Sequence, residues 1–172
     1  LDEAFAQRAA RCEKMCRHFH LSLQSGCDSV LKRMGRRYTT AQYTDIMNVI
    51  RKYMPDASFT TDVMVGFVGE TEAEFAQSME YVQQAGFARI HVFPYSVREG
   101  TAAARMGGHL DKQAKQLRAR EMNRIAAAIE RGFVESMLGK VIEVIPEPAE
   151  DGEMHGYARN YCRVAIAAAE GL

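Results

Sequence analysis

The fold of this chain is decided by residues 58–70, which read Ser-Phe-Thr-Thr-Asp-Val-Met-Val-Gly-Phe-Val-Gly-Glu. The apolar and β-branched residues predict a buried strand over about 58–67. Gly66 and Gly69 leave the backbone bare where the chain departs from this strand, so a flat ligand could lie against it. Asp62 is a carboxylate inside the apolar run, and burying it without a partner is costly. Asp62 therefore either has a partner, faces a cavity at the strand end, or is solvated at an ordinary strand-to-helix turn.

The segments around this strand alternate between helix and strand patterns. Helices are expected over residues 1–16, from Asp28 to Gly35, from Thr39 to Pro55, from the capping box Thr71-Glu72-Ala73-Glu74 to Gly86, and over 111–137. Further strands are expected from His18 to Leu23 and from Ala88 to Phe93. We expect Asp28 to cap the second helix, and the last helix to bury Leu117, Ile125, Ile129 and Phe133. This order is typical of parallel α/β structure, either an open sheet or part of a barrel.

The sequence changes character at Gly139. Val141 to Ile145 alternates like a half-buried strand, Pro146 to Gly152 supplies turn residues, and Tyr157 to Ala167 can pair back across the turn. We therefore divide the chain into an α/β part, 1–138, and a hairpin-like β part, 139–172. Three parallel strands leave a sheet edge exposed, which favours self-association or pairing with missing domains. The start at Leu1, without Met, is expected of a processed or excised segment.

Composition limits the possible classes of function. The 172 residues are 47% hydrophobic and 26% charged, which supports a folded core and excludes a disordered chain. The formal net charge is zero, but two basic clusters stand out: Lys32, Arg33, Arg36 and Arg37, and then Lys112, Lys115, Arg118, Arg120 and Arg124. Such clusters are either solvated helix faces or surfaces for a polyanion. We expect no membrane association, because no apolar run reaches the roughly 18 residues of a membrane span. Four irregularly spaced cysteines without a secretory signal favour the cytoplasm.

Polar residues follow each expected strand. Gln24, Asp62 and the segment Tyr95–Arg98 fall near the carboxyl ends of successive strands, where parallel α/β folds bind ligands. This succession predicts a small-molecule site.

Two other groups of residues suggest metal ligands. Cys12 and Cys16 have the spacing of the first two cysteines in a C-x₃-C-x₂-C cluster loop, but Phe19 stands where the third would be. Partly buried helix packing is the favoured interpretation of this pair. His18 and His20 alternate along a strand and share a face, so they either line a cavity or form a metal pair. We expect a cavity lining and assign no metal site.

With these residues in view, the chain resembles the radical S-adenosylmethionine methylthiotransferases. The resemblance rests on residues 18–40, on 61–71, which contain Asp-Val-Met-Val-Gly-Phe-Val-Gly-Glu, and on 93–102, which read Phe-Pro-Tyr-Ser-Val-Arg-Glu-Gly-Thr-Ala. From Gly139 onward, Gly156-Tyr157 and Asn160-Tyr161 resemble the start of the RNA-binding TRAM module that ends these enzymes. The segments 21–27 and 36–39 are most similar to the branch that modifies threonylcarbamoyladenosine in tRNA.

The resemblance implies a fold and a reaction. Residues 1–138 would be the C-terminal half of a partial (β/α)₆ TIM-like radical SAM barrel, and residues 139–172 a truncated all-β TRAM hairpin. The parent enzyme would use S-adenosyl-L-methionine and two [4Fe–4S] clusters. One cluster generates a 5′-deoxyadenosyl radical and the other supplies the methylated sulfur. The product would carry a methylthio group at C2 of N6-threonylcarbamoyladenosine, so the implied partner is tRNA.

The resemblance also implies roles for cofactor-binding residues. Gln24 would contact the ribose, Arg36 the methionyl carboxylate, and Asp62 the ribose hydroxyls. Gly66 would let the backbone approach the adenine, and Tyr95 lies on the third strand-end segment of the same site. No catalytic residue is assigned.

Parts of the family pattern are missing from this chain. The family has three cysteines for the second cluster in an N-terminal domain and three more in a loop after the first barrel strand. These 172 residues include neither, so we expect no bound cofactor and no activity of this chain alone. The remaining alternatives are a methylthiotransferase acting on isopentenyladenosine in tRNA or on a ribosomal protein aspartate, a non-catalytic RNA-binding module, and an unrelated α/β enzyme. No glycine-rich phosphate loop supports the last of these.

Overall fold

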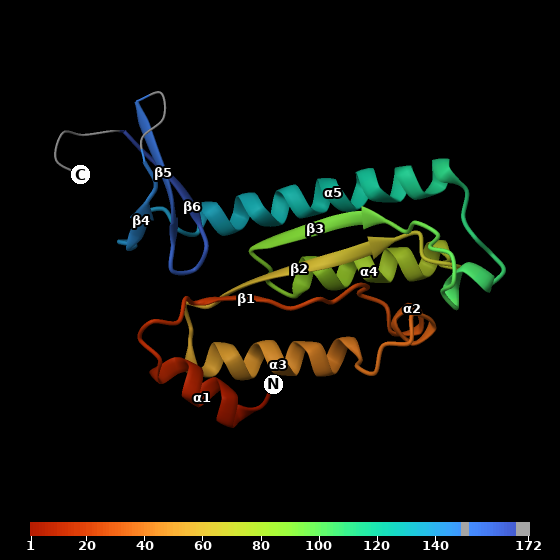
Figure 1. Cartoon of the computed structure of the whole chain (residues 1–172), viewed down its shortest axis with the longest axis horizontal. Helices are drawn as coiled ribbons and strands as arrows, with labels where there is room; N and C mark the ends of the chain where they lie inside the picture. The colour runs from red at the N-terminus through yellow and green to blue at the C-terminus, as the bar shows by residue number, and fades with distance from the viewer. Residues whose placement is uncertain (149–151, 168–172) are drawn as a thin grey trace.

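The computed structural model describes residues 1–148 and 152–167, and it contains two β-sheets (Figure 1). The first sheet is parallel, with the order β1 (His18–His20), β2 (Ser58–Val65) and β3 (Arg89–Pro94). The second is antiparallel, with the order β4 (Val144–Pro146), β5 (Glu153–Ala158) and β6 (Arg163–Ala167). The predicted parallel α/β architecture of the first part is confirmed.

Helices cover one face of the parallel sheet. They are α1 (Glu3–Arg11), α2 (Asp28–Arg33), α3 (Thr40–Tyr53), α4 (Glu72–Gln84) and α5 (Lys112–Glu135), with a short 3₁₀ helix, η1 (Ala103–Arg105), before α5. The main core lies where Phe59 and Val63 of β2 meet Met47 of α3, Phe75 of α4 and Met122 of α5. Within the described residues, the opposite face of the sheet carries no helix (Figure 1). None of the helices in the described part of the chain is long and apolar enough to cross a membrane.

The N-caps of α3 and α4 follow the sequence signals closely, and the N-cap of α2 does not. Thr71 and Glu74 form the predicted capping box of α4, and Thr39 forms a second one with Gln42 at α3. At α2 the expected cap is wrong. Cys27 occupies the N-cap without a side-chain hydrogen bond, because the Asp28 carboxylate instead accepts a bond of 2.7 Å from the backbone N–H of Thr40.

The buried stripe of α5 differs from the expected one at its start. Leu117 is 55% exposed, whereas Ile125 is buried and Ile129 and Phe133 are half-buried. Met122 is buried and marks the side of α5 that faces the core. At about 100° per residue, Leu117 lies about 140° around the helix from Met122. Leu117 therefore cannot face the same core.

Two N-terminal elements are shorter than expected. α1 ends at Arg11, because Cys12 adopts an extended conformation and accepts a turn bond from Met15. β1 ends at His20, although a single bridge between Gln24 and Val63 continues its direction.

The β part forms three strands rather than a two-stranded hairpin. Tyr157 belongs to β5, which pairs with β4 on one side and with β6 on the other. The chain turns between Ala158 and Arg163, so the expected single strand from Tyr157 to Ala167 is wrong. Residues 149–151 of the expected turn, and the end of the domain at 168–172, lie outside the described residues.

Candidate functional site

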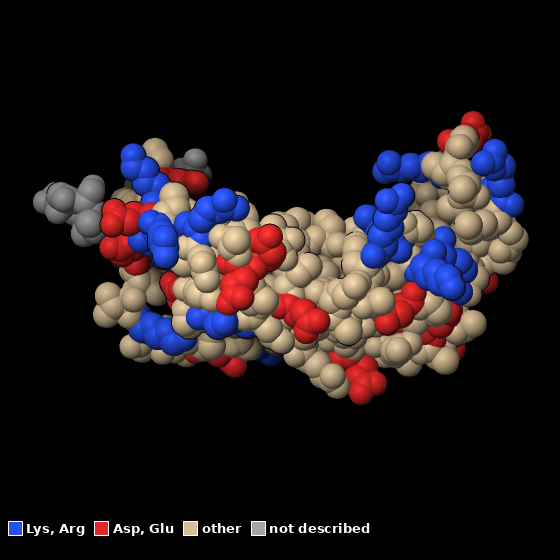
Figure 2. All heavy atoms as spheres, turned by 90° about the horizontal axis from the view of Figure 1, so that it is seen from below, with Lys and Arg blue, Asp and Glu red and all other residues tan. Residues whose placement is uncertain are grey.

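The helix-free face of the parallel sheet is polar. Alternate residues point to it from neighbouring strands: His18 and His20 of β1, Thr60 and Asp62 of β2, and His91 of β3. The molecule is hollowed between the β4–β6 sheet at one end and the loops at the other, with basic side chains on both sides of the hollow (Figure 2). A polar sheet face inside a hollow is a natural place for a ligand.

Asp62 has partners within the chain. Its Oδ2 lies 3.0 Å from His20 Nε2 and accepts a bond of 3.3 Å from Ser22 Oγ. The Thr60 hydroxyl lies 2.9 Å from His18 Nε2 and 3.0 Å from His20 Nδ1, which links the two strands. The Asp62 side chain remains 29% exposed, so part of the carboxylate is open to the hollow.

Gln24 is tied to the backbone on both sides of Asp62. Its N–H donates to the Asp62 carbonyl over 2.8 Å, and its carbonyl accepts from the Met64 N–H over 2.9 Å. Gln24 is buried and has φ of 71°, a left-handed conformation that is uncommon outside glycine. Such backbone strain at a strand end is frequent at ligand sites.

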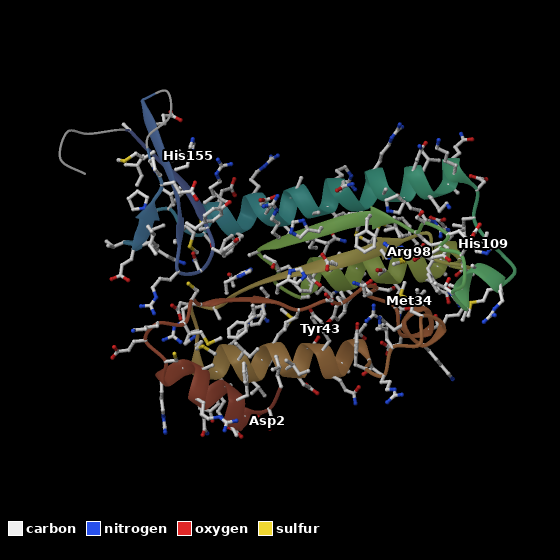
Figure 3. All side chains as sticks on the ribbon, in the orientation of Figure 1. Asp2, Met34, Tyr43, Arg98, His109 and His155 are labelled. Atoms are coloured by element: carbon white, nitrogen blue, oxygen red, sulfur yellow. The ribbon has the colours of Figure 1, made fainter. Side chains whose placement is uncertain are left out.

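A cavity of about 390 Å³ lies beyond the carboxyl ends of the strands and brings Gln24 and Tyr95 together. Tyr95 is buried, stacks on His109 with the ring centroids 6.0 Å apart, and meets Phe67 edge-on. The buried Tyr95 hydroxyl has no hydrogen-bond partner among the described residues. Figure 3 shows Arg98 and His109 at this same end of the molecule.

The loop between β2 and α4 is held by a buried carboxylate. Gly66 and Gly69 have φ of 68° and 69°, and a Cβ at Gly66 would lie 2.5 Å from Lys115 Cγ. Glu70 Oε2 accepts bonds from the Gly66 N–H over 2.7 Å and from Arg118 Nη1 over 2.8 Å. Burial raises the pKa of Glu70, although Gly66 and Arg118 act in the opposite direction.

Sequence reasoning missed this Glu70–Arg118 pair, because 48 residues separate its members. The signal available in the sequence was the carboxylate that directly follows the second glycine of the strand end. The pair also removes Arg118 from the surface basic cluster of α5, since its side chain is only 11% exposed.

The first basic cluster also contains both a paired and an exposed arginine. Arg33 forms a two-pronged contact with Glu74, whose pKa is lowered to about 2 by the Arg33 hydrogen bonds, and Ser29 and the Thr71 N–H add to this effect. Arg36 lies on the exposed connection between α2 and α3 and is absent from the residues that line the strand-end cavity. The structure therefore brings Gln24 and Tyr95 together at the strand-end cavity, with Gly66 in the adjoining loop. Asp62 lies within β2, next to Gln24 but outside the residues that line the cavity, and Arg36 also lies outside them.

A second cleft, of about 580 Å³, separates the polar sheet face from the β4–β6 sheet. His18 and His20 both line it, as expected of histidines on one strand face. His18 stacks on Tyr161 at 4.5 Å, and Tyr161 stacks on Tyr157 at 4.7 Å. Burial lowers the pKa of His18.

The donors of the described residues fit a nucleoside better than a metal. Across residues 1–148 and 152–167, no group of three or more His, Cys, Asp or Glu side chains is placed to hold a metal ion. Cys12 and Cys16 are both exposed and free, which corrects the expectation of partial burial. In contrast, Gln24 and Tyr95 line the strand-end cavity, and the partly exposed Asp62 carboxylate lies on the polar face of the sheet. An amide, an aromatic ring and a carboxylate suit a ribose and a planar base.

Comparisons with known proteins agree with this chemistry. Residues 1–82 match the model of the radical SAM superfamily. The chain is 36% identical, over 94% of its length, to the threonylcarbamoyladenosine tRNA methylthiotransferase of Bacillus subtilis, and 37% identical, over 89%, to the protein of the same name from Thermotoga maritima. It is also 37% identical, over its whole length, to the tRNA-2-methylthio-N(6)-dimethylallyladenosine synthase of Alkaliphilus oremlandii. The chain spans between 36% and 37% of the length of these relatives.

Proposed function

We propose that this chain, which is similar to tRNA methylthiotransferases over most of its length, forms the nucleoside-holding part of a radical S-adenosylmethionine methylthiotransferase acting on tRNA. The observation that carries the proposal is that Gln24 lines the strand-end cavity together with Tyr95 and is bonded through its backbone to Asp62 of β2. The similarity to two kinds of tRNA methylthiotransferase supports the reaction class.

The residues fit the nucleoside of S-adenosylmethionine. The open side of the Asp62 carboxylate can accept from the two ribose hydroxyls, while His20 and Ser22 hold its orientation. Gln24, fixed by its two backbone bonds, can donate to or accept from the sugar. Glu70 fixes the loop that carries Gly66, and adenine could approach the Gly66 backbone there only if the Lys115 side chain, which lies where a Cβ would stand, moved aside. In the parent enzyme, the cofactor and its [4Fe–4S] clusters would supply the radical and the sulfur.

We propose N6-threonylcarbamoyladenosine of tRNA as the modified nucleoside. The support is the similarity to the two threonylcarbamoyladenosine methylthiotransferases. The dimethylallyladenosine synthases are comparably similar, so dimethylallyladenosine is the alternative substrate.

We also propose a domain arrangement for the chain. Residues 1–138 would form half of a (β/α)₆ barrel, and residues 139–172 would form part of a TRAM module.

The test is to express the full-length protein that contains this chain in a bacterium lacking its own tRNA methylthiotransferases. Mass spectrometry of the tRNA nucleosides should show 2-methylthio-N6-threonylcarbamoyladenosine, and the Asp62→Ala variant should not produce it. The dimethylallyl product in its place would assign the alternative substrate. Absence of both products, with soluble protein present, would contradict the proposed function.

We also propose that this chain by itself forms no radical, because cluster ligation needs thiolates from several cysteines. Iron and sulfide analysis after anaerobic reconstitution should find no stoichiometric cluster on the 172-residue chain. One [4Fe–4S] cluster per chain would overturn this part of the proposal.

A second function, RNA binding, is favoured by the aromatic and basic lining of the cleft beside the β4–β6 sheet. Tyr157 and Tyr161 expose their rings there, next to Arg163. Aromatic rings near cations suit a single-stranded nucleic acid. Binding of a tRNA anticodon stem-loop should weaken as salt rises, and Arg163→Gln should reduce the slope of log K against log salt by about one unit.

A further inference from the structure

The cavity at the strand ends is lined by a basic side chain that has no acidic partner. Its walls come from Gln24, from the ends of β2 and β3, and from the loop that follows β3. Among the described residues that line it, Arg98 is the only charged one. The nearby Arg33 and Arg118 are each paired with a glutamate, whereas the salt bridges and side-chain hydrogen bonds within 1–148 and 152–167 include none from the Arg98 guanidinium. Its charge is therefore available to a ligand.

Arg98 sits on an ordered turn rather than a loose loop. The Thr101 N–H and hydroxyl both donate to the Arg98 carbonyl, over 3.3 and 2.8 Å. The turn is tied to the sheet just upstream, where the Tyr95 N–H donates to the Val65 carbonyl over 2.8 Å. Figure 3 shows Arg98 beside the carboxyl ends of the strands. This turn thus holds the backbone at Arg98 beside the cavity, and the Arg98 side chain is exposed.

The walls around Arg98 decide which ligand chemistry fits. Met64, Phe93 and Pro94 are apolar, and Gln24 adds a neutral hydrogen-bonding group. None of the described lining residues is acidic, so the guanidinium is not neutralised from within the cavity. A guanidinium in a partly apolar cavity binds a carboxylate or a phosphate through two parallel hydrogen bonds. A volume of about 390 Å³ is also within the usual range for a small-molecule site.

We propose that Arg98 is a binding residue for an oxyanion of the bound ligand. That oxyanion is either the carboxylate of the amino-acid part of S-adenosylmethionine or a phosphate of the RNA substrate. The proposal rests on the proposed function for the identity of the ligand. If the oxyanion is the carboxylate, Arg98 takes the role that the sequence resemblance implied for Arg36. Both side chains are exposed, but only Arg98 lines the cavity.

The test measures binding of three adenosine compounds, by calorimetry, to the full-length protein that contains this chain. 5′-Methylthioadenosine is uncharged, S-adenosylhomocysteine adds a carboxylate, and adenosine 5′-monophosphate adds a phosphate. Arg98→Gln should raise the Kd of at least one charged compound roughly tenfold or more, as expected for loss of a charge-assisted hydrogen bond. The Kd of 5′-methylthioadenosine should change by less than about twofold. Arg105→Gln is the matched control, because Arg105 is exposed in the same segment and does not line the cavity.

The outcomes separate the sources of the oxyanion. Loss of S-adenosylhomocysteine binding alone assigns the cofactor carboxylate, and loss of monophosphate binding alone assigns a substrate phosphate. The Arg98 proposal is overturned if Arg98→Gln binds all three compounds like wild type, if it weakens all three equally, or if Arg36→Gln alone produces the selective loss. Failure of wild type to bind 5′-methylthioadenosine would count against the nucleoside site itself, and failure to bind any of the three overturns both proposals. Thermal melting of each variant checks that the fold is intact.

Discussion

At the scale of single residues, the buried Glu70–Arg118 pair is the contact on which the strand-end loop depends. Arg118→Met leaves the Glu70 carboxylate buried at 1% side-chain exposure without its cation. Removing one partner of a buried ion pair costs about 3–5 kcal/mol of unfolding free energy, because the remaining charge is uncompensated. Urea unfolding should show this loss for Arg118→Met, and less than about 0.5 kcal/mol for the exposed Arg120→Met.

The double variant Glu70→Gln with Arg118→Met separates charge from hydrogen bonding at this loop. The side-chain oxygen of the introduced glutamine can still accept from the Gly66 N–H, and no unpaired charge remains buried. We expect the double variant to recover most of the stability that Arg118→Met alone loses. Equal instability of the two variants would show that the guanidinium is needed for its packing over Phe75 instead.

A second residue-scale prediction concerns acid stability. The folded-state pKa of Glu74 is about 2, below the ordinary value of 4.5 for a glutamate. Its stabilising contribution is therefore present above pH 4.5 and is lost as the pH falls toward 2. Because solvent near the surface screens this ion pair, we expect its contribution to be about 1 kcal/mol. As the pH falls from about 5 to 2, the free energy of unfolding should decrease less for Glu74→Gln than for wild type. The exposed Glu80→Gln serves as control, and identical pH dependence of all three proteins would contradict the prediction.

At the scale of elements, the start of α4 depends on its cap. Thr71→Ala removes the hydroxyl that accepts from the Glu74 N–H over 3.2 Å, which should cost about 1 kcal/mol. Thr71→Ser keeps the acceptor and should remain within a few tenths of a kcal/mol of wild type. Thermal unfolding checks both variants, and equal melting temperatures for Ala and Ser would show that the cap contributes nothing.

The elements were predictable wherever the signal is local. The Thr71–Glu74 capping box and the stops at Gly86 and Pro55 depend on residues within one turn, so the sequence located α3 and α4 closely. The Asp28 cap was wrong because a residue 12 positions away competes for its carboxylate. Leu117 was misplaced because the apolar spacing of a long helix fits more than one face.

The site was predictable only in part for the same reason. Strand-end residues such as Asp62 follow from periodicity and topology. The pairing of Asp62 with His20, across 42 residues, depends on the register between two strands, which the sequence alone does not specify.

At the scale of the whole molecule, the β4–β6 sheet is attached to the parallel sheet through a few specific contacts. The Ser58 hydroxyl donates to the Asn160 carbonyl over 2.5 Å, and Arg159 donates to the carbonyls of Glu13 and Met15. The stack of His18 on Tyr161 adds an aromatic contact between the two sheets. The cleft between the sheets thus depends on the turn that joins β5 to β6.

We expect Tyr161→Asn to loosen this attachment. Asn tolerates the φ of 64° at this position but lacks the ring. The loss of aromatic stacking should lower the stability of the contact by about 0.5–1.5 kcal/mol, in addition to the effect of the lost buried area. Hydrogen exchange should speed up at β5 and β6 while β2 stays protected. Tyr157→Ala removes only the outer ring of the stack and should have a smaller effect. Unchanged exchange in Tyr161→Asn would mean that the hydrogen bonds alone hold the sheets together.

The hydrogen bond between Ser58 and Asn160 has a consequence for the order of folding. It closes a loop of 102 residues, and the entropy of loop closure opposes such a bond before any stabilisation is gained. The parallel sheet instead pairs strands that are much nearer in the chain, and it can form first. Docking of the turn near Asn160 should therefore be the last step of folding and the first interaction to break under mild denaturant. During synthesis, the polar sheet face that carries His18 and His20 would stay uncovered until the turn near Asn160 has emerged from the ribosome.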